Sequence, residues 1–454
     1  MRNKKTLILI LLLTFFIIPT FNYINADIET ETEITQNLAN TIQGNQNGFT
    51  YMIKDSKAYI ISYTTKEEEI KNLTIPEKIN NYPVIEIRDN AFKNTSIINL
   101  TIPSSVETIG DYAFYNCNKL ESITIKGCKN INEYAFANCI SLKDITLEEG
   151  IENIAGNTFL NCGMKEISIP ASVKKIGSNA FTNCVNLQSF AVTQGNKKFI
   201  SENGVLYSND MKNLIAYPIS KEDESYTVND KTTAINESAF YSNKYLKNIT
   251  LSNKLKSIGK YAFYNTRSLT SIEIPENVEE IKEETFLGSV SLTSVTFKDG
   301  VITIGSNAFR ECENLTTVKF PNTLQKLEGG AFKNCSKLNN ISFPDSLHTI
   351  GKEVFRGCSS LTKVSLPIYV NYLRDYVFAD CTNLQEVTLN EGVTNINQKA
   401  FSNCPKLTKI EATYSLSTID STAFDGSKNI KIYAPYGSYA LTFAEENKIN
   451  NESI

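Results

Sequence analysis

Ten cysteines and one histidine are the side chains of this 454-residue chain best suited to chemistry. Thiolates can act as nucleophiles, hold metals or join as disulfides. No two cysteines have the C-x-x-C spacing of a zinc site, so we predict no metal site and no cofactor. Nine cysteines stand three residues after a phenylalanine: Cys117, Cys139, Cys162, Cys184, Cys312, Cys335, Cys358, Cys381 and Cys404.

The place three residues after the phenylalanine holds other small or polar residues elsewhere: Thr95, Asn243, Thr266, Ser289 and Ser427. Small size and a weak hydrogen-bonding group are therefore what this place requires. The tenth cysteine, Cys128, fills a place usually taken by Val. We predict buried free thiols, because free Cys is among the most buried residue types. Disulfides are the alternative, since unpaired thiols are unusual in an oxidising compartment.

Catalytic chemistry finds little support in the sequence. His348 is the only histidine and Trp is absent, so neither a histidine triad nor a multi-histidine zinc site can be built. His348 falls in a column of polar residues, which predicts a surface position. The chain has no Gly-rich phosphate loop, and its carboxylates are scattered along exposed columns. We therefore predict that the protein is not an enzyme.

Phenylalanines recur at a fixed spacing and set the organisation of the chain. From residue 240 to residue 424 every step is 23 residues, and an earlier series has steps of 22 or 23. The two series are Phe92, Phe114, Phe136, Phe159 and Phe181, and Phe240, Phe263, Phe286, Phe309, Phe332, Phe355, Phe378, Phe401 and Phe424. A unit of this length cannot bury its own apolar side, so copies must stack as a solenoid.

Each repeat can be divided into three short elements, counted from its phenylalanine. Apolar residues at +9 and +11 alternate with polar residues at +8 and +10, which predicts a short strand from +6 to +11. The apolar residues at −8 and −5 predict a second extended piece. The Ala-Phe-x-x-Cys segment between them predicts a tight helical turn. The fold class is therefore a repeat solenoid, predominantly β with short helical turns, of about 14 coils of 22–23 residues.

The pattern resembles the BspA-type, or Treponema-type, leucine-rich repeat of bacterial surface proteins. The residues that carry the resemblance are Leu269-Thr-Ser-Ile-Glu-Ile-Pro275, followed by Val278, Ile281 and Phe286. The segment Leu361-Thr-Lys-Val-Ser-Leu-Pro367 fits equally well, and the match covers about residues 73–435. The resemblance implies a right-handed leucine-rich-repeat solenoid that adheres to host proteins, such as extracellular-matrix components, or to other cells.

Residues 1–26 have the pattern of a signal peptide. Arg2, Lys4 and Lys5 precede an apolar run at 7–18, which is too short to span a bilayer comfortably, and Ala26 is the expected last residue before cleavage. We therefore predict a secreted or extracellular protein without a membrane span after cleavage, a retained N-terminal anchor being the alternative. Residues 27–48 are expected to be a polar linker.

The repeats are flanked and interrupted by other segments. We predict a cap hairpin at 49–72, repeats at 73–195 and 227–435, and a C-terminal cap at 436–454 with one short helix. Caps are needed because a bare terminal coil exposes its core. Residues 196–226 are expected to form an inserted hairpin. It is either a structural brace or a binding projection that uses Tyr207, Tyr217 and Tyr226.

The +10 side chains are the candidate ligand-binding residues, because they face outward from the strands of the repeat. The candidates are Thr250, Glu273, Thr296, Lys319, Ser342, Ser365, Thr388 and Glu411, with Tyr207 and Tyr217 of the insertion. The plainer explanation for the hydroxyl residues is β-propensity and solubility. A net charge of −4 argues against nucleic acid and anionic membranes as partners.

These observations predict a monomeric, secreted or surface-exposed adhesin that recognises a protein or cell-surface ligand. A structural or self-assembling surface component without a host ligand is the alternative.

Overall fold

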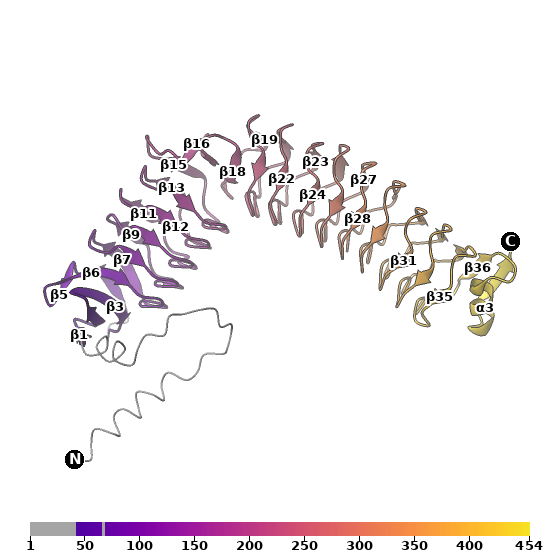
Figure 1. Cartoon of the computed structure of the whole chain (residues 1–454), viewed down its shortest axis with the longest axis horizontal. Helices are drawn as coiled ribbons and strands as arrows, with labels where there is room; N and C mark the ends of the chain where they lie inside the picture. The colour runs from indigo at the N-terminus through magenta and orange to yellow at the C-terminus, as the bar shows by residue number, and fades with distance from the viewer. Residues whose placement is uncertain (1–41, 66–68) are drawn as a thin grey trace, which may run out of the picture.

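The coils stack into one arched solenoid, drawn from a computed structural model that describes residues 42–65 and 69–454 (Figure 1). The predicted signal peptide and residues 27–41 of the predicted linker lie outside the described residues. Within these residues, no helix has the length and apolar character needed to cross a membrane. The predicted solenoid fold is confirmed, with about 17 turns rather than the expected 14. The additional turns lack the corner phenylalanine, so counting phenylalanines missed them.

One strand of nearly every coil, formed by the +8 to +11 residues, joins the main sheet; this sheet is divided into four sections along the stack, and the coil of Phe332 contributes no strand to it. The strands are parallel and in register, as in β23 and β25, where Ile272 lies opposite Val295. Main-sheet strands are β4 (Ile70–Thr74), β7 (Ile97–Ile102), β9 (Ser122–Ile125), β11 (Asp144–Leu147), β13 (Glu166–Ile169), β15 (Ser189–Val192), β19 (Ser225–Thr227), β21 (Asn248–Thr250), β23 (Ser271–Ile274), β25 (Ser294–Phe297), β27 (Thr317–Lys319), β30 (Lys363–Ser365), β32 (Glu386–Thr388), β34 (Lys409–Glu411) and β36 (Lys431–Ala434).

A second sheet of shorter parallel strands contains the −5 residues. Its strands are β6 (Tyr82–Ile87), β8 (Thr108–Ile109), β10 (Asn130–Ile131), β12 (Asn153–Ile154), β14 (Lys175–Ile176), β18 (Asn213–Ala216), β20 (Ala234–Ile235), β22 (Ser257–Ile258), β24 (Glu280–Ile281), β26 (Thr303–Ile304), β28 (Lys326–Leu327), β29 (Thr349–Ile350), β31 (Tyr372–Leu373), β33 (Asn395–Ile396) and β35 (Thr418–Ile419). Buried aliphatic side chains from both sheets meet inside each coil.

The two sheets are joined by a corner, which we define as positions −4 to +3, or residues 259–266 in the coil of Phe263. The predicted helical turn at this corner is wrong. The backbone instead enters the left-handed region at −2 and at +2, as at Tyr261 (φ 58°) and Asn265 (φ 54°), whereas a right-handed helical turn needs negative φ throughout. The prediction that the +2 asparagines tolerate a left-handed backbone is confirmed for Asn116, Asn138, Asn161, Asn183, Asn334 and Asn403.

Corner phenylalanines stack on one another through the interior. The rings of Phe114 and Phe136 are 5.1 Å apart and 1° from parallel, and those of Phe286 and Phe309 are 4.9 Å apart and 5° from parallel. Each of these side chains is fully buried. The exact repeat in sequence thus places a ring on a ring at every step, and aromatic contact adds to the burial of apolar area.

All ten cysteines are buried and free. Each +3 thiol donates a hydrogen bond to the carbonyl of the phenylalanine in the preceding coil, as from Cys139 to Phe114 (3.2 Å) and from Cys358 to Phe332 (3.3 Å). Where the place holds serine, the hydroxyl does the same: Ser289 donates to the carbonyl of Phe263 (2.9 Å). The requirement for a small hydrogen-bonding side chain at +3 therefore has a defined partner.

The insertion divides the buried residues into two cores. Strands β16 (Phe199–Glu202) and β17 (Val205–Ser208) form an antiparallel hairpin, and β17 then pairs antiparallel with β18. Leu206 packs into the N-terminal core, whereas Val205 and Tyr207 pack into the C-terminal core. Residues 213–227 form a coil of their own, because β18 joins the second sheet and β19 joins the main sheet. We call this segment the inserted coil.

Both ends of the stack carry additional elements. At the N-terminal end β1 (Ile42–Gln46), β2 (Phe49–Lys54) and β3 (Lys57–Tyr63) are antiparallel, β3 pairs parallel with β6, and β5 (Lys78–Ile79) pairs with β6. At the C-terminal end α3 (Tyr439–Glu446) places Phe443 against Phe424, with ring centroids 6.4 Å apart. Strand β37 (Asn450–Ser453) then adds to the edge of β36, so the last coil is covered.

Candidate functional site

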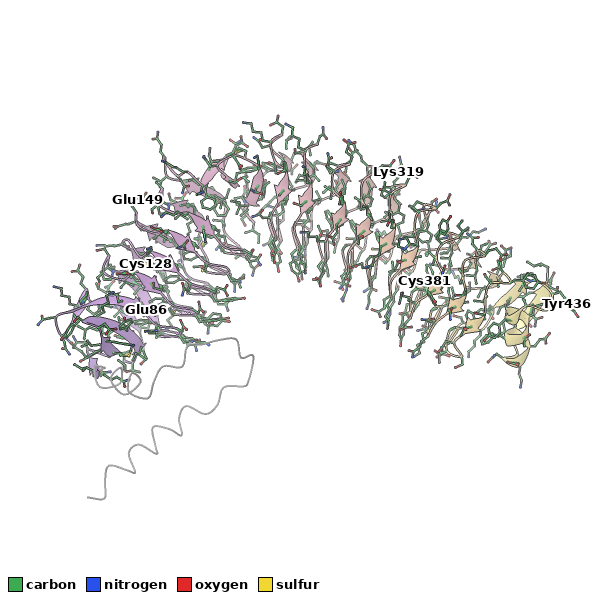
Figure 2. All side chains as sticks on the ribbon, viewed as in Figure 1. Glu86, Cys128, Glu149, Lys319, Cys381 and Tyr436 are labelled. Carbon is green, nitrogen blue, oxygen red and sulfur yellow. The ribbon has the colours of Figure 1, made fainter. Side chains whose placement is uncertain are left out.

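The outward-facing +10 side chains form a row along the main sheet, which we call the outer row. Strand register fixes their spacing, because Glu273 lies opposite Thr296 and Thr296 lies opposite Lys319. Neighbouring parallel strands are about 4.8 Å apart. The side chains therefore repeat along the stack at close to that distance, on a backbone held by hydrogen bonds on both sides. Lys319 marks this row on the outer side of the arch (Figure 2).

None of the eight +10 candidates is buried. Five are exposed, namely Thr250, Glu273, Lys319, Ser342 and Ser365, and three are half-buried, namely Thr296, Thr388 and Glu411. The main sheet is interrupted around Ser342, which lies outside any strand. The structure therefore brings the candidates together in two parts: one from Thr250 to Lys319 and one from Ser365 to Glu411.

The second part of the outer row is bordered by charged side chains that sequence reasoning did not single out. These belong to the +8 residues. Glu386 pairs with Lys363 (2.8 Å) and with Lys409 (3.1 Å), and Lys409 also pairs with Glu411 (2.5 Å). The pKa of Glu386 is lowered, mainly by its hydrogen bond with Lys363 and next by that with Lys409. The pKa of Lys409 is raised, mainly by Glu411 and next by Glu386. The sequence contained a sign of these ion pairs, because Lys and Glu alternate every 23 residues at the +8 position.

The first part of the outer row is bordered by neutral side chains. Its +8 residues are Asn248, Ser271, Ser294 and Thr317, which lie beside Thr250 and Thr296. Hydroxyl and amide groups can both donate and accept hydrogen bonds. The first part of the row therefore has neutral neighbours but itself carries Glu273 and Lys319, whereas the second part lies among charged side chains that pair with one another.

Of the three tyrosines proposed for a binding projection, Tyr207 and Tyr217 are buried and Tyr226 is half-buried, which corrects that hypothesis. Tyr207 is 0% exposed and Tyr217 is 4% exposed, so neither can contact a ligand across the surface. The hydroxyl of Tyr207 lies 2.5 Å from that of Tyr226, and burial is the main cause that raises the pKa of both phenols. The insertion is thus packed between the two cores, because its apolar residues alternate into both of them.

Metal-ligating side chains, His348 and the thiols were the remaining candidates for chemistry. Among the described residues, no group of three or more His, Cys, Asp or Glu could hold a metal ion. His348 is exposed as predicted, with its Nδ1 atom 3.0 Å from the hydroxyl of Thr349. Burial raises the pKa of nine of the ten cysteine thiols, to about 12 for Cys128 and Cys184, which disfavours the nucleophilic thiolate. Cys117 differs, because its hydrogen bond with Cys139 lowers its pKa.

Comparison with protein families identifies the repeat. The model of the BspA-type leucine-rich repeat region matches residues 58–188, 220–336 and 302–431. The chain belongs to this family. The gap between the first two matches falls on the insertion, where the BspA-type pattern is interrupted.

Solved structures agree with this assignment. A leucine-rich repeat protein from Bacteroides ovatus is 26% identical, with a TM-score of 0.60, and the match covers 86% of this BspA-type chain and 99% of the other. A leucine-rich repeat protein from Eubacterium ventriosum is 23% identical, with a TM-score of 0.50, and the match covers 85% and 95%. Comparison with curated proteins found no significant match. The BspA-type solenoid is a protein-interaction fold, which agrees with a site built for contact.

Proposed function

We propose that this protein is a secreted or surface-exposed binding protein, an adhesin that recognises host or cell-surface proteins through the outer row. The observation that carries the proposal is the row itself: eight polar side chains in one column, none of them buried, seven on two parallel sheets and Ser342 between them. A solenoid offers such an extended surface without needing a pocket. The signal-peptide pattern at 1–26 and membership of the BspA-type family support an extracellular site of action.

The experiment is binding of the purified protein to fibronectin, fibrinogen, laminin, collagen and epithelial cells, measured at 50 and 300 mM NaCl. We expect saturable binding to at least one of them. Because the row contains few charges, binding should weaken only modestly at the higher salt concentration.

The variant that tests the site replaces Glu273, Lys319 and Glu411 together with Ala. A control variant replaces Glu107, Lys256 and Gln325, which are exposed and precede strands of the second sheet. We expect about a tenfold loss of affinity in the first variant only, a change of about 1.4 kcal/mol. Equal behaviour of the two variants would refute the outer row as the site. Absence of binding together with reversible self-association in sedimentation would favour a structural, self-assembling role instead.

A further inference from the structure

The corners form a ladder of backbone hydrogen bonds along the stack. In the regular steps, the N–H groups at 0 and +2 donate to carbonyls of the next coil, and the N–H at −2 does so in all of them except at Tyr261 and Lys399. Asn157 donates to Ser178 (3.1 Å), and Phe159 donates to Ala180 (2.8 Å). Asn161 donates to the carbonyl of Thr182 (2.9 Å). Within each of the two phenylalanine series, every corner is in this way joined to the corner that follows it by at least two bonds.

This ladder is broken between β15 and β19, at the top of the arch (Figure 1). We call the coils before the break the N-terminal arm and those after it the C-terminal arm. The inserted coil has a shortened corner: only two residues separate Leu214 from Tyr217, whereas four separate Ile235 from Phe240. Tyr217 takes the place of the missing phenylalanine, because its ring stacks on Phe240 (4.9 Å) and its N–H donates to Ala239 (2.7 Å). The remainder of the corner has no counterpart in the inserted coil.

Backbone groups on both sides of the break are left without backbone partners. In the described chain, the N–H groups of Asn179, Phe181 and Asn183 donate to no backbone carbonyl. On the other side, the carbonyls of Glu237 and Tyr241 accept from no backbone N–H. Donors on one side of the break and acceptors on the other therefore lack the backbone partners that most regular corners provide. One side-chain contact crosses the break, from Asn179 Nδ2 to Glu237 Oε1 (3.1 Å).

The side-chain ladders end at the same break. Asn161 donates to Asn138 (3.0 Å), and Asn183 donates to Asn161 (3.3 Å), but no amide of the described residues donates to the side-chain oxygen of Asn183. The ring of Tyr241 stacks on that of Tyr264 (4.8 Å, 5° from parallel). Its other face meets no aromatic ring of the described residues. The series of side-chain amides thus ends at Asn183 on one side of the break, and the tyrosine stack begins at Tyr241 on the other.

These ends line a groove of about 430 Å³. Its walls include amides from one arm and rings from the other, namely Asn138, Asn161, Asn183, Tyr241, Tyr261 and Tyr264. The volume lies within the range of small-molecule sites. The lining contains no Lys or Arg and a single carboxylate, that of Glu284. The groove is therefore aromatic, rich in hydrogen-bonding groups and close to neutral.

We propose that this groove binds a short, neutral oligosaccharide. A sugar ring offers a C–H face that packs on the tyrosine rings, and its hydroxyls both donate and accept, as the amides and open backbone groups require. An anionic glycan is less suited, because its negative charge would meet the carboxylate of Glu284 in a lining that contains no Lys or Arg. An extended peptide is less suited, because the open groups lie on corners rather than along a straight strand edge. This ligand site is separate from the outer row.

The test is titration of the full protein with neutral oligosaccharides, namely cellohexaose, maltohexaose, chitohexaose and mannohexaose, followed by tyrosine fluorescence and calorimetry. Because the chain contains no Trp, the fluorescence reports tyrosines directly. We expect at least one neutral sugar to bind saturably. Tyr241→Ala should weaken that binding by about tenfold or more, and Tyr241→Phe should retain it, because stacking needs only the ring.

The matched control is Tyr112→Ala, which removes a ring from a similar stacked pair, Tyr112 and Tyr134 (4.8 Å), far from the break. It should leave sugar binding within about twofold of the original. Circular dichroism melting checks that each variant folds. Binding unchanged in Tyr241→Ala, tighter binding of an alginate or hyaluronan hexasaccharide, binding of a proline-rich peptide in place of sugar, or no saturation by any sugar at 10 mM would each overturn the proposal.

Discussion

At the scale of single residues, the +3 position shows how the repeat uses a thiol. Its S–H group satisfies a buried carbonyl of the preceding coil, and serine performs the same task at position 289. The sequence indicated this role, because Cys, Thr, Ser and Asn alternate in one column. It could not identify the acceptor, since that carbonyl belongs to a residue 25 or 26 places earlier.

Buried thiols should be unreactive in the folded protein. Burial raises the pKa of Cys404 to about 12 and also raises the pKa of every other thiol except Cys117, so these nine form almost no thiolate at pH 8. The pKa of Cys117 is lowered by its hydrogen bond with Cys139, but its side chain is fully buried and out of reach of a reagent. We expect a chromogenic disulfide reagent to detect no rapidly reacting thiol in the native state and ten after denaturation in guanidinium. Detection of none after denaturation would show that the thiols are paired as disulfides.

Glu149 provides a pH-dependent contact between coils. Its carboxylate accepts hydrogen bonds from the N–H groups of Ala171 and Ser172, each 2.9 Å long. The Ala171 N–H is the main cause that lowers the pKa of Glu149. A lowered pKa stabilises the fold above the unfolded pKa of about 4.3, and this stabilisation is lost as the pH falls through the folded value.

Glu149→Gln should therefore lower stability at pH 7 by a few tenths of a kcal/mol, about the size expected for an exposed charged contact. The difference from the original protein should shrink as the pH is lowered below about 4. Urea denaturation at pH 7, 5 and 3.5 measures it. A difference that grows on acidification would contradict this account.

At the scale of elements, each corner depends on its two left-handed residues. The +2 position is often Asn or Gly, which have the lowest cost in this region, and the sequence indicated it. The −2 position is equally left-handed but holds Tyr112, Glu284 and Lys399 as well as Asn. Residue type therefore gave no signal there, and a helical turn was predicted in place of the true corner. Stacking of neighbouring corners overrides the local preference at −2.

Replacing Asn334 tests the corner. Asn334 has φ 62° and donates its N–H to the carbonyl of Arg356 (2.8 Å). Asn334→Gly should be nearly neutral, whereas Asn334→Val should cost about 1–2 kcal/mol, because a β-branched side chain is strained in this region. The melting temperature measures both. Asn340→Val, at an exposed position without positive φ, is the control and should change little.

At the scale of the whole molecule, the insertion determines how the arms are joined. The Phe series indicated that the repeat was interrupted, because its step lengthens from 23 to 59 residues between Phe181 and Phe240. The sequence did not reveal that part of the extra length forms a complete coil, since Tyr217 replaces the phenylalanine and the corner is shortened. It also did not reveal the groove, which exists only because corners from the two arms meet across the break.

Leu206 should be essential to the joint between the cores. It is fully buried, and Leu206→Ala should cost about 2–5 kcal/mol through lost burial and a remaining cavity. Ile200→Ala, in the same hairpin but 39% exposed, should cost under about 1 kcal/mol and is the control. Thermal unfolding followed by circular dichroism compares them. Equal, small effects would mean that the hairpin does not brace the arms.

The broken corner ladder also has a mechanical consequence. Coils stacked in a row behave as springs in series, so a pull on the two ends loads every interface equally, and the softest one extends first. Interfaces within each phenylalanine series carry the load through the ring stack and the corner hydrogen bonds, whereas the junction lacks most of these hydrogen bonds. Under tension the molecule should therefore open at this elbow before any coil unwinds, as two stiff rods joined by a compliant hinge.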